Sequence, residues 1–333
     1  MKQCAVLSFS ERGGRLAQQI AESMAGEWEV SCVQPRGDLS EKAGMLFGSC
    51  DALIFVGACG IAVRAIAPYV VSKTCDPAVI VIDERGQHAI SLLSGHIGGA
   101  NELTKYIAAA IGADPVITTA TDVNERFSVD AWAAKQGLMI DSMDLAKAFS
   151  AEILKRDLPL CSELTIEGKL PKGIVLGQSG DLGASVSCKT KDPFRNTLHL
   201  IPKCLHLGIG CRRGTPAEQI QSLVKKTLAD HGIDVRAVKQ IASIDVKADE
   251  EGLLAFAREL GVPTVFYSAE DLQRLQGDFS ASAFVQTQVG VDNVCERSAV
   301  MSAGKDAQLI IRKTAADGVT VAVALENRRL TFE

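Results

Sequence analysis

His96 lies in an unusual glycine-rich segment, SLLSGHIGGANEL, between a predicted strand and a predicted helix. Its three glycines are Gly95, Gly98 and Gly99. They leave backbone N–H groups free and let a large ligand approach closely, and the helix N-terminus adds a positive dipole. Such a place favours an anion, with His96 as general acid or base and Asn101 as a ligand contact. The alternative interpretation is a tight turn with a structural histidine.

A second glycine loop, GACGIAVRAIAP, repeats this design after a fully apolar run. It contains Gly57, Gly60 and Arg64, and Lys73 follows the predicted helix. Arg64 can bind a ligand carboxylate. Pairing of Arg64 with Asp83 or Glu84 remains the alternative.

Acidic and hydroxyl side chains follow two further predicted strands. Glu84 is a candidate acid or base, although a turn explains its position equally well. The segment TTATD supplies Thr118, Thr119 and Asp122. The threonines can hydrogen-bond polar groups of a ligand and Asp122 is a reserve acid or base, whereas helix capping is the alternative.

The second half of the chain has a basic strand-to-helix loop, GIGCRRGTP, with Gly210, Arg212 and Arg213. Two arginines at the start of a well-capped helix favour an anion. A solvated charged face is the alternative. Farther on, the segment VGVDNVCERSA adds Glu296 as a candidate ligand contact, although spacing of about one turn also suits a helix-stabilising pair.

The elements that must position these residues alternate between strand and helix, which predicts an α/β fold with a parallel sheet in the N-terminal part. Ligands of such sheets bind outside the carboxyl ends of the strands. We therefore expect the loops 57–60, 94–101 and 118–122 to share one edge.

Three parts follow from the pattern along the chain. Residues 1–137 form the N-terminal α/β domain with the glycine-rich loops. Residues 138–203, with short apolar runs split by Gly, Pro and Lys, predict a small β-rich middle domain or linker. Residues 204–333 predict a second α/β domain, which includes a hairpin formed by QLIIRK and VTVAVAL around AADG.

Composition excludes several classes of protein. The chain has 333 residues, a formal charge of −5 and only 5% aromatic residues, which argues against nucleic-acid binding. Its ten cysteines form no Cys-x-x-Cys pair and lie near no His-x(3–5)-His, so we expect no protein-bound metal. No apolar run reaches membrane-spanning length and no cleavage-type leader opens the sequence, so we expect a cytoplasmic protein without membrane contact. The nucleotide fingerprints are missing, which disfavours a nucleotide-dependent oxidoreductase.

Residues 57–122 resemble the cobalt-precorrin-5A hydrolase family of anaerobic cobalamin biosynthesis, and residues 208–220 and 289–299 resemble its C-terminal domain. The resemblance implies hydrolysis of cobalt-precorrin-5A, a polycarboxylate tetrapyrrole: water opens its δ-lactone and acetaldehyde leaves. It implies no cofactor, because the substrate macrocycle carries the cobalt.

This chemistry needs an activated water and a stabilised oxyanion. We assign His96 as acid or base and the N–H groups around Gly98 and Gly99 as oxyanion donors, with Glu84 and Asp122 in reserve. The alternative is a non-catalytic tetrapyrrole-binding or shuttling protein of the same pathway. A homodimer is compatible with either.

Overall fold

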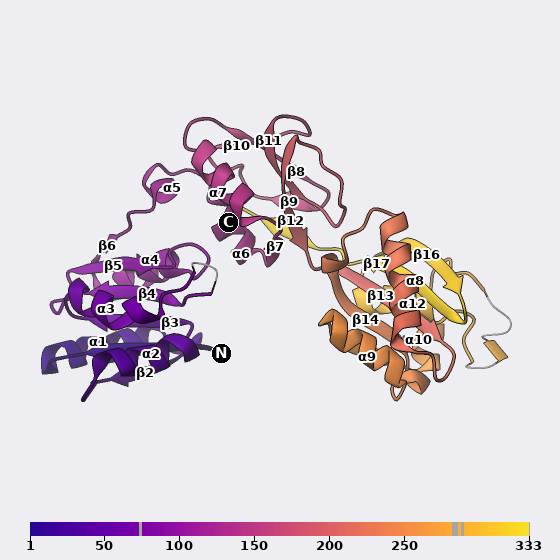
Figure 1. Cartoon of the computed structure of the whole chain (residues 1–333), viewed down its shortest axis with the longest axis horizontal. Coiled ribbons are helices and arrows are strands. Elements are labelled where there is room, and N and C mark those ends of the chain that lie inside the picture. Colours follow the sequence, from indigo (N-terminus) through magenta and orange to yellow (C-terminus); the bar gives the residue numbers. More distant parts are fainter. Residues whose placement is uncertain (73–74, 282–285, 288–289, 333) are drawn as a thin grey trace. The chain divides into compact units, whose positions relative to one another are not determined.

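The computed structural model describes residues 1–72, 75–281, 286–287 and 290–332 (Figure 1). Contacts divide the chain into two compact units, residues 1–134 with 153–156 and residues 135–152 with 157–333. In the described part of the chain, no helix is long and apolar enough to cross a membrane. The predicted three-part division at 137/138 and 203/204 stays a prediction.

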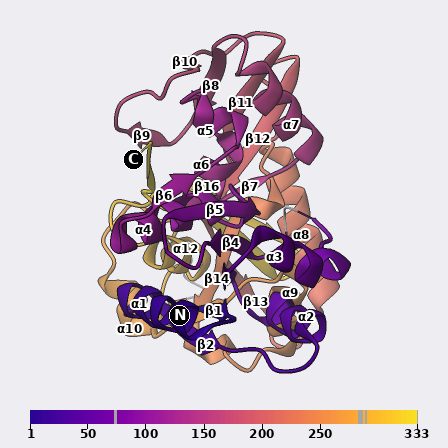
Figure 2. The same ribbon diagram turned by 90° about the vertical axis from the view of Figure 1, so that its left-hand side faces the viewer.

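The first unit is built on a six-stranded sheet. Its strands are β1 (Lys2–Ser8), β2 (Trp28–Val33), β3 (Ala52–Val56), β4 (Ala78–Ile82), β5 (His88–Leu93) and β6 (Asp114–Val116). Their order is β2-β1-β3-β4-β5-β6. In Figure 2 the labelled strands follow one another from β2 at the bottom to β6 at the top.

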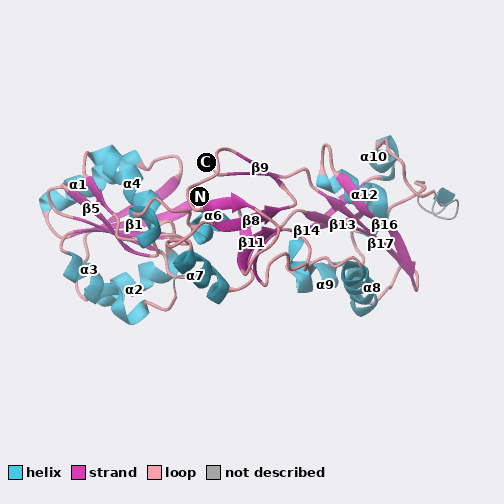
Figure 3. Cartoon of the chain, turned by 90° about the horizontal axis from the view of Figure 1, so that it is seen from above, coloured by secondary structure: helices cyan, strands magenta, loops and turns pink. Residues whose placement is uncertain are grey.

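Helices cover both faces of this sheet because β3 and β4 are apolar at every position and buried throughout. The helices are α1 (Glu11–Ser23), α2 (Leu39–Ser49), α3 (Cys59–Ile66), α4 (Ala100–Ile111), the short α5 (Ala120–Val123) and α6 (Val129–Lys135). Figure 3 shows α1 and α4 on one side and α2 and α3 on the other, which agrees with the two hydrophobic cores. The predicted α/β fold is confirmed.

The direction of β5 corrects one expectation about the loops. Strands β2, β1, β3 and β4 are parallel, but β5 pairs antiparallel with β4, with Val79 opposite Leu93 and Ile82 opposite Ala89. Strand β6 is parallel to β5. The loops after β5 and β6 therefore lie at the edge opposite the loop after β3, and the expectation of one shared edge is wrong.

The cause is the short connection between β4 and β5, residues 83–87. A parallel neighbour needs a crossover of a dozen or more residues, so five residues can only form a hairpin. The Asp83 carboxylate closes the turn by accepting hydrogen bonds from the backbone N–H groups of Gln87 (2.9 Å) and His88 (2.6 Å).

The second unit begins with a five-stranded sheet of order β10-β8-β11-β12-β7. Its strands are β7 (Leu138–Ile140), β8 (Leu158–Ser162), β10 (Ile174–Leu176), β11 (Leu182–Val186) and β12 (Asn196–Pro202), and α7 (Met143–Glu152) lies between β7 and β8 in the chain. All pairs are parallel except β12 with β7. Strand β9 (Thr165–Glu167) pairs with the C-terminal β18 (Arg329–Thr331). The strand content agrees with the β-rich prediction for this stretch.

The C-terminal sheet has the order β15-β14-β13-β17-β16. Its strands are β13 (Leu205–Cys211), β14 (Val238–Ile244), β15 (Thr264–Tyr267), β16 (Gln308–Ala316) and β17 (Val319–Leu325). Its helices are α8 (Ala217–Asp230), α9 (Glu251–Leu260), α10 (Ala269–Arg274) and α12 (Cys295–Ala303). Short 3₁₀ turns lie at Ala67–Tyr69, Val235–Ala237 and Asp245–Lys247. Helices α8 and α9 pack on one face, and α12 packs on the other.

Two glycine positions shape this sheet. A Cβ at Gly208 would lie 1.8 Å from the Cys295 carbonyl oxygen, so only glycine lets α12 approach β13 this closely. The predicted hairpin is confirmed as β16–β17, and its turn consists of Asp317 (φ 48°) and Gly318 (φ 80°). Two positive φ values suit the right-handed strand twist.

Candidate functional site

His96 is held between two carboxylates at the edge where the β5–α4 and β6–α5 loops meet. Its Nε2 lies 2.9 Å from Asp122 Oδ2, and its Nδ1 lies 3.1 Å from Asp130 Oδ1. Ser128 Oγ lies 3.0 Å from Nδ1 and donates to Asp130 Oδ1 at 2.8 Å. We call His96, Asp122, Ser128 and Asp130 the His96 clamp. Sequence separations of 26 to 34 residues mean that only the folded sheet edge assembles it.

Asn101 fixes the Asp122 side of the clamp from the first turn of α4. Its Nδ2 donates to Asp122 Oδ2 at 3.0 Å and to Thr119 Oγ1 at 3.1 Å. Its Oδ1 accepts from Ser91 Oγ at 2.7 Å. Asn101 is buried, so these bonds satisfy its amide and orient the carboxylate. The structure thus brings together four residues that the sequence singled out: His96, Asn101, Thr119 and Asp122.

The glycines of the loop permit this packing. A Cβ at Gly95 would lie 2.6 Å from Asn101 Oδ1, and a Cβ at Gly98 would lie 2.9 Å from the Ser94 carbonyl oxygen. Ser94 itself has a φ of 57°, and its buried Oγ has no hydrogen-bond partner among the residues described. Strain and an unsatisfied hydroxyl are typical of functional loops.

The loop's N–H groups correct part of the oxyanion prediction. The Gly99 N–H donates to the His96 carbonyl oxygen at 3.0 Å, so it is not available to a ligand. The Gly98 N–H makes no hydrogen bond within the described ranges and remains the candidate donor. Gly99 instead provides a φ of 81° at the start of α4.

The two carboxylates determine the charge of His96. Burial disfavours the protonated ring, but the hydrogen bonds and negative charges of Asp130 and Asp122 outweigh burial, so the pKa of His96 is raised above its ordinary value of 6.5. An imidazolium fits the geometry, because both ring nitrogens face acceptors. The ring can give up a proton and recover it.

The clamp has one open end. The Asp130 side chain is 6% exposed, whereas the His96 and Asp122 side chains are 15% and 22% exposed. Lys105 Nζ approaches Asp122 Oδ1 at 3.5 Å from solvent. A ligand therefore reaches the His96–Asp122 pair and not Asp130. Thr118 is exposed beside this end.

The remaining predicted residues of this unit lie at the other edge of the sheet. Glu84 is exposed and accepts a hydrogen bond from Ser10, which caps α1. Arg64 is exposed on α3, near Gly60. Gly57 follows β3 and donates its N–H to the Ile82 carbonyl oxygen at 2.8 Å. The structure does not bring these residues to His96, and Lys73 lies outside the described residues.

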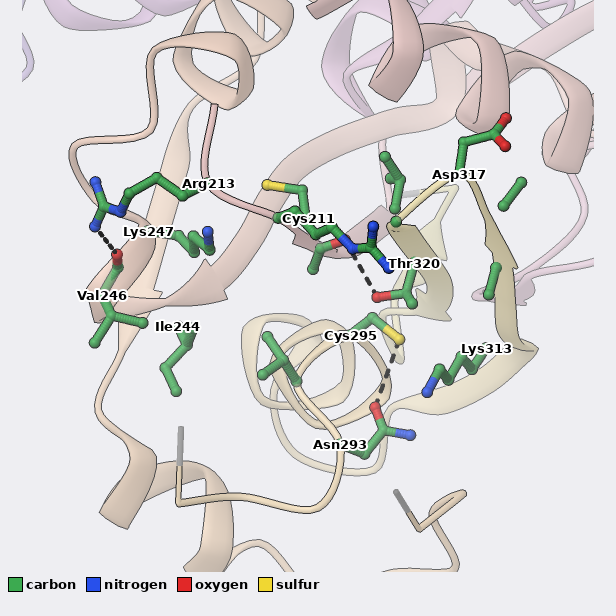
Figure 4. A pocket seen from close by; sticks show the side chains of 17 residues that line it. Cys211, Arg213, Ile244, Val246, Lys247, Asn293, Cys295, Lys313, Asp317 and Thr320 are labelled. Atoms are coloured by element: carbon green, nitrogen blue, oxygen red, sulfur yellow. Dashed lines mark hydrogen bonds between the residues drawn. The ribbon is translucent and has the colours of Figure 1, made fainter. Parts of the chain in front are cut away.

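In the second unit, a cavity of about 800 Å³ opens at the carboxyl ends of β13 and β14. The hairpin β16–β17 and the start of α12 complete its wall. Gly210, Arg212 and Arg213 of the basic loop line it, and Lys247 and Lys313 add two cations. Figure 4 shows Arg213 and Lys247 on one side and Lys313 on the other. Its volume lies within the range of ligand sites in general.

Glu296 lies behind this cavity and does not line it. Its fully buried carboxylate accepts hydrogen bonds from Ser280 N (2.8 Å), Ser280 Oγ (2.9 Å) and the backbone N–H of Lys313 (2.8 Å). It therefore fixes β16 to the preceding loop. Asp292 and Arg297 form an ion pair five residues apart, with 2.7 Å between Arg297 Nε and Asp292 Oδ1.

Sequence reasoning missed Ser128, Asp130, Lys247 and Lys313. Ser128 and Asp130 lie in the segment SVDAW at the start of α6, where they resemble an ordinary helix cap. Lys247 lies in the 3₁₀ turn that follows the buried strand β14, and its place after this strand was the available signal. In the described part of the chain, no group of three or more His, Cys, Asp or Glu side chains can hold a metal ion.

Comparisons with known proteins cover most of the chain. The family model described as cobalamin synthesis G N-terminal matches residues 41–122, and the one described as cobalamin synthesis G C-terminus matches residues 205–324. A cobalt-precorrin-5A hydrolase of Salmonella typhimurium is 39% identical over 305 residues, which are 87% of this chain and 86% of that protein. A cobalt-precorrin-5A hydrolase of Priestia megaterium is 35% identical over 300 residues, 84% and 80% of the two chains. A solved cobalamin biosynthesis protein G homologue from Sulfolobus solfataricus has 23% identity and a TM-score of 0.45, covering 98% of this chain and 97% of its own.

Proposed function

The chain belongs to the cobalamin synthesis G family, whose matching members include cobalt-precorrin-5A hydrolases, and we propose from this membership that it hydrolyses cobalt-precorrin-5A. The resemblance noted for residues 57–122, 208–220 and 289–299 is thereby confirmed. The single observation that carries a mechanism is the His96 clamp, because a histidine whose pKa is raised by two carboxylates lies at an open sheet edge.

The reaction consumes one water and releases acetaldehyde. Water adds to the lactone carbonyl, the acyl–oxygen bond breaks, and the ring opens to a carboxylate and an alcohol. The alcohol then loses its proton as the carbon–carbon bond breaks, and the bond's electron pair returns to the macrocycle. Both stages need proton transfer, and the first needs an oxyanion to be stabilised.

The clamp supplies these needs. Protonated His96 donates to the departing oxygen through the open His96–Asp122 end, and Asp122 shares the proton with Nε2 at 2.9 Å. Asp130 and Ser128 hold the other ring nitrogen and keep the ring in one orientation. The Gly98 N–H stabilises the oxyanion. Asn101 and Thr119 hold Asp122 in place, and the Asn101 Nδ2 is the donor that links them.

We further propose that the protein needs no resident metal or organic cofactor, because the ten cysteines and five histidines show no ligand spacing in the sequence. The cobalt enters and leaves as part of the substrate. Cleavage of a carbon–carbon bond then classes the enzyme as a hydrolase acting on that bond.

The test is anaerobic incubation of the purified full chain with cobalt-precorrin-5A, followed by an acetaldehyde assay. We expect stoichiometric acetaldehyde without added metal or nucleotide, and the same yield with a chelator that leaves the macrocyclic cobalt in place. Binding without acetaldehyde would favour the carrier alternative. Loss of turnover with the chelator would contradict the cofactor proposal alone.

A further inference from the structure

We propose that the cavity in the C-terminal sheet binds the carboxylate-bearing edge of a tetrapyrrole, with Lys313 and Arg212 as the principal contacts. The lining by itself points to an amphipathic polyanion, and only its identification as a tetrapyrrole rests on the proposed function. The cavity belongs to a different unit from the His96 clamp, so its role can be tested separately.

The first argument is the apolar floor. Ile244 ends β14, Val294 precedes α12 and Val319 begins β17, and all three side chains line the cavity. Val246 and Cys295 add further apolar surface, as Figure 4 shows for Ile244, Val246 and Cys295. A site for a small hydrophilic anion has no need of such a floor, whereas the face of a large ring does.

The second argument is the charge of the rim. Among the described residues, four cationic side chains line the cavity, Arg212, Arg213, Lys247 and Lys313, against the single carboxylate of Asp317. Two of them have protein partners: Arg213 pairs with Asp249 at 3.0 Å, and the half-buried Lys247 pairs with the buried Glu250 at 3.2 Å. Neither Lys313 nor Arg212 has a carboxylate within ion-pair distance in the part of the chain that the structure describes. These two are the charges that a ligand can neutralise.

The third argument is the rigid support of Lys313. Its backbone N–H donates to Glu296, which is fully buried and also bound by Ser280. The Arg212 backbone is fixed by a 3.1 Å hydrogen bond from its N–H to the Gly318 carbonyl oxygen. Both cations therefore start from backbones that are held in place, which lowers the entropy lost when they bind a ligand.

The experiment compares two air-stable corrins with the full chain. Cobyrinic acid carries seven carboxylates, and cobinamide carries amides at the corresponding arms of the same ring. Equilibrium dialysis followed by corrin absorbance gives both dissociation constants at two salt concentrations. We expect cobyrinic acid to bind at least tenfold more tightly than cobinamide, with the difference shrinking at high salt.

Lys313→Gln removes one of the two proposed contacts, and Lys225→Gln, an exposed lysine of α8 outside the cavity, is the matched control. We expect about tenfold weaker binding of cobyrinic acid by Lys313→Gln and no change by Lys225→Gln. If Lys313→Gln does not fold, Arg212→Gln takes its place, and we expect the same loss of affinity for cobyrinic acid.

Equal affinity for the two corrins, or unchanged binding in both Lys313→Gln and Arg212→Gln, would overturn the proposal. So would displacement of cobyrinic acid by equimolar ATP, because that would assign the cations to a nucleotide. If the wild-type chain releases acetaldehyde but binds cobyrinic acid and cobinamide with equal affinity, this site is refuted and the hydrolase proposal stands. If cobyrinic acid binding depends on Lys313 but no acetaldehyde is released, the hydrolase proposal is refuted and this binding site stands.

Discussion

The His96 clamp and the C-terminal cavity differ in whether their charged side chains have partners of opposite charge. In the clamp, the His96 ring lies within 3.1 Å of two carboxylates, and the loop beside it is strained at Ser94. In the cavity, Lys313 and Arg212 lack carboxylate partners among the described residues, and an apolar floor lies beneath them. Neutralised, oriented charge suits proton transfer, whereas unmatched charge beside apolar surface suits binding. The two regions should therefore differ in which kinetic quantity a substitution changes.

The largest expected effect is that of His96→Ala. Loss of a positioned acid or base costs about 10²–10⁴ in rate, so single-turnover acetaldehyde release should slow by that factor. The affinity for cobyrinic acid should not change, because the cavity lies in the other unit. His88→Ala is the matched control, since the His88 side chain is 56% exposed and lies outside the clamp.

A His96→Ala variant that melts early but turns over normally would make His96 structural. Asp122, the exposed end of the clamp, would then be the next candidate. Equal losses of rate and of corrin affinity would instead contradict the assignment of catalysis to the clamp and of binding to the cavity.

The second effect is a shift of the pH profile in Asp130→Asn. The pKa of His96 is raised by its carboxylate partners against the effect of burial. An acid of raised pKa works below that pKa, so activity falls as pH rises through it. Removing one carboxylate lowers the pKa of His96, so the falling limb of the pH profile should move to lower pH. The measurement is single-turnover rate from pH 5 to 9.

Asp144→Asn, at an exposed carboxylate of α7, is the control for a lost negative charge. A rate that drops equally at every pH would show that Asp130 only supports the fold. A limb that moves upward would contradict the charged state of His96.

The third effect concerns the stability of the strained loop in Gly98→Ala. The added Cβ would lie 2.5 Å from Ser94 Cβ and 2.9 Å from the Ser94 carbonyl oxygen, and the backbone cannot yield cheaply. We expect a loss of about 1–3 kcal/mol, as is usual when extra methyl groups are forced into packed sites. Both tryptophans, Trp28 and Trp132, belong to the first unit, so tryptophan fluorescence in urea reports on this unit alone.

Gly48→Ala is the comparison variant, because a Cβ at Gly48 meets nothing within 4 Å in helix α2. It should leave stability unchanged or raise it by up to about 1 kcal/mol. Equal stability of the two variants would mean that the 94–99 loop relaxes without cost.

The sequence predicted the elements better than their directions. The alternation of strands and helices predicted the α/β fold of the first unit, and the fully apolar run before Gly57 corresponds to β3. The direction of β5 was missed because strand–helix alternation suggested a parallel neighbour, although the five residues 83–87 are too few for a crossover. The length of the β4–β5 connection would have shown that β5 runs antiparallel to β4, and therefore that the loops after β3 and β5 lie at opposite edges of the sheet.

The sites were predicted in part, for a similar reason. His96 lies in the loop after β5, and Asn101 and Asp122 lie in the first turns of α4 and α5, so strand-to-helix junctions pointed to them. Asp130 is recognised as part of the clamp only in the fold, where the chain after α5 places its carboxylate beside Nδ1 of His96. Lys313 lies inside a hairpin strand, and only the fold shows that no described carboxylate accompanies it. Partners separated by long stretches of sequence leave no local pattern.

The smallest expected effect is that of Arg64→Ala. This variant tests whether the position of the β3 loop, at the edge opposite His96, matters for function. Arg64 is exposed on α3, beside the edge formed by the carboxyl end of β3. The five residues of β4 span about 16 Å between the two edges, and helices cover both faces, so a ligand at His96 does not reach Arg64. We expect substrate affinity and single-turnover rate to stay within about twofold, below the roughly tenfold cost of one charge-assisted bond. A tenfold loss of affinity in Arg64→Ala, with the melting temperature unchanged, would show that the macrocycle binds at the β3 edge and that chemistry at His96 needs another explanation.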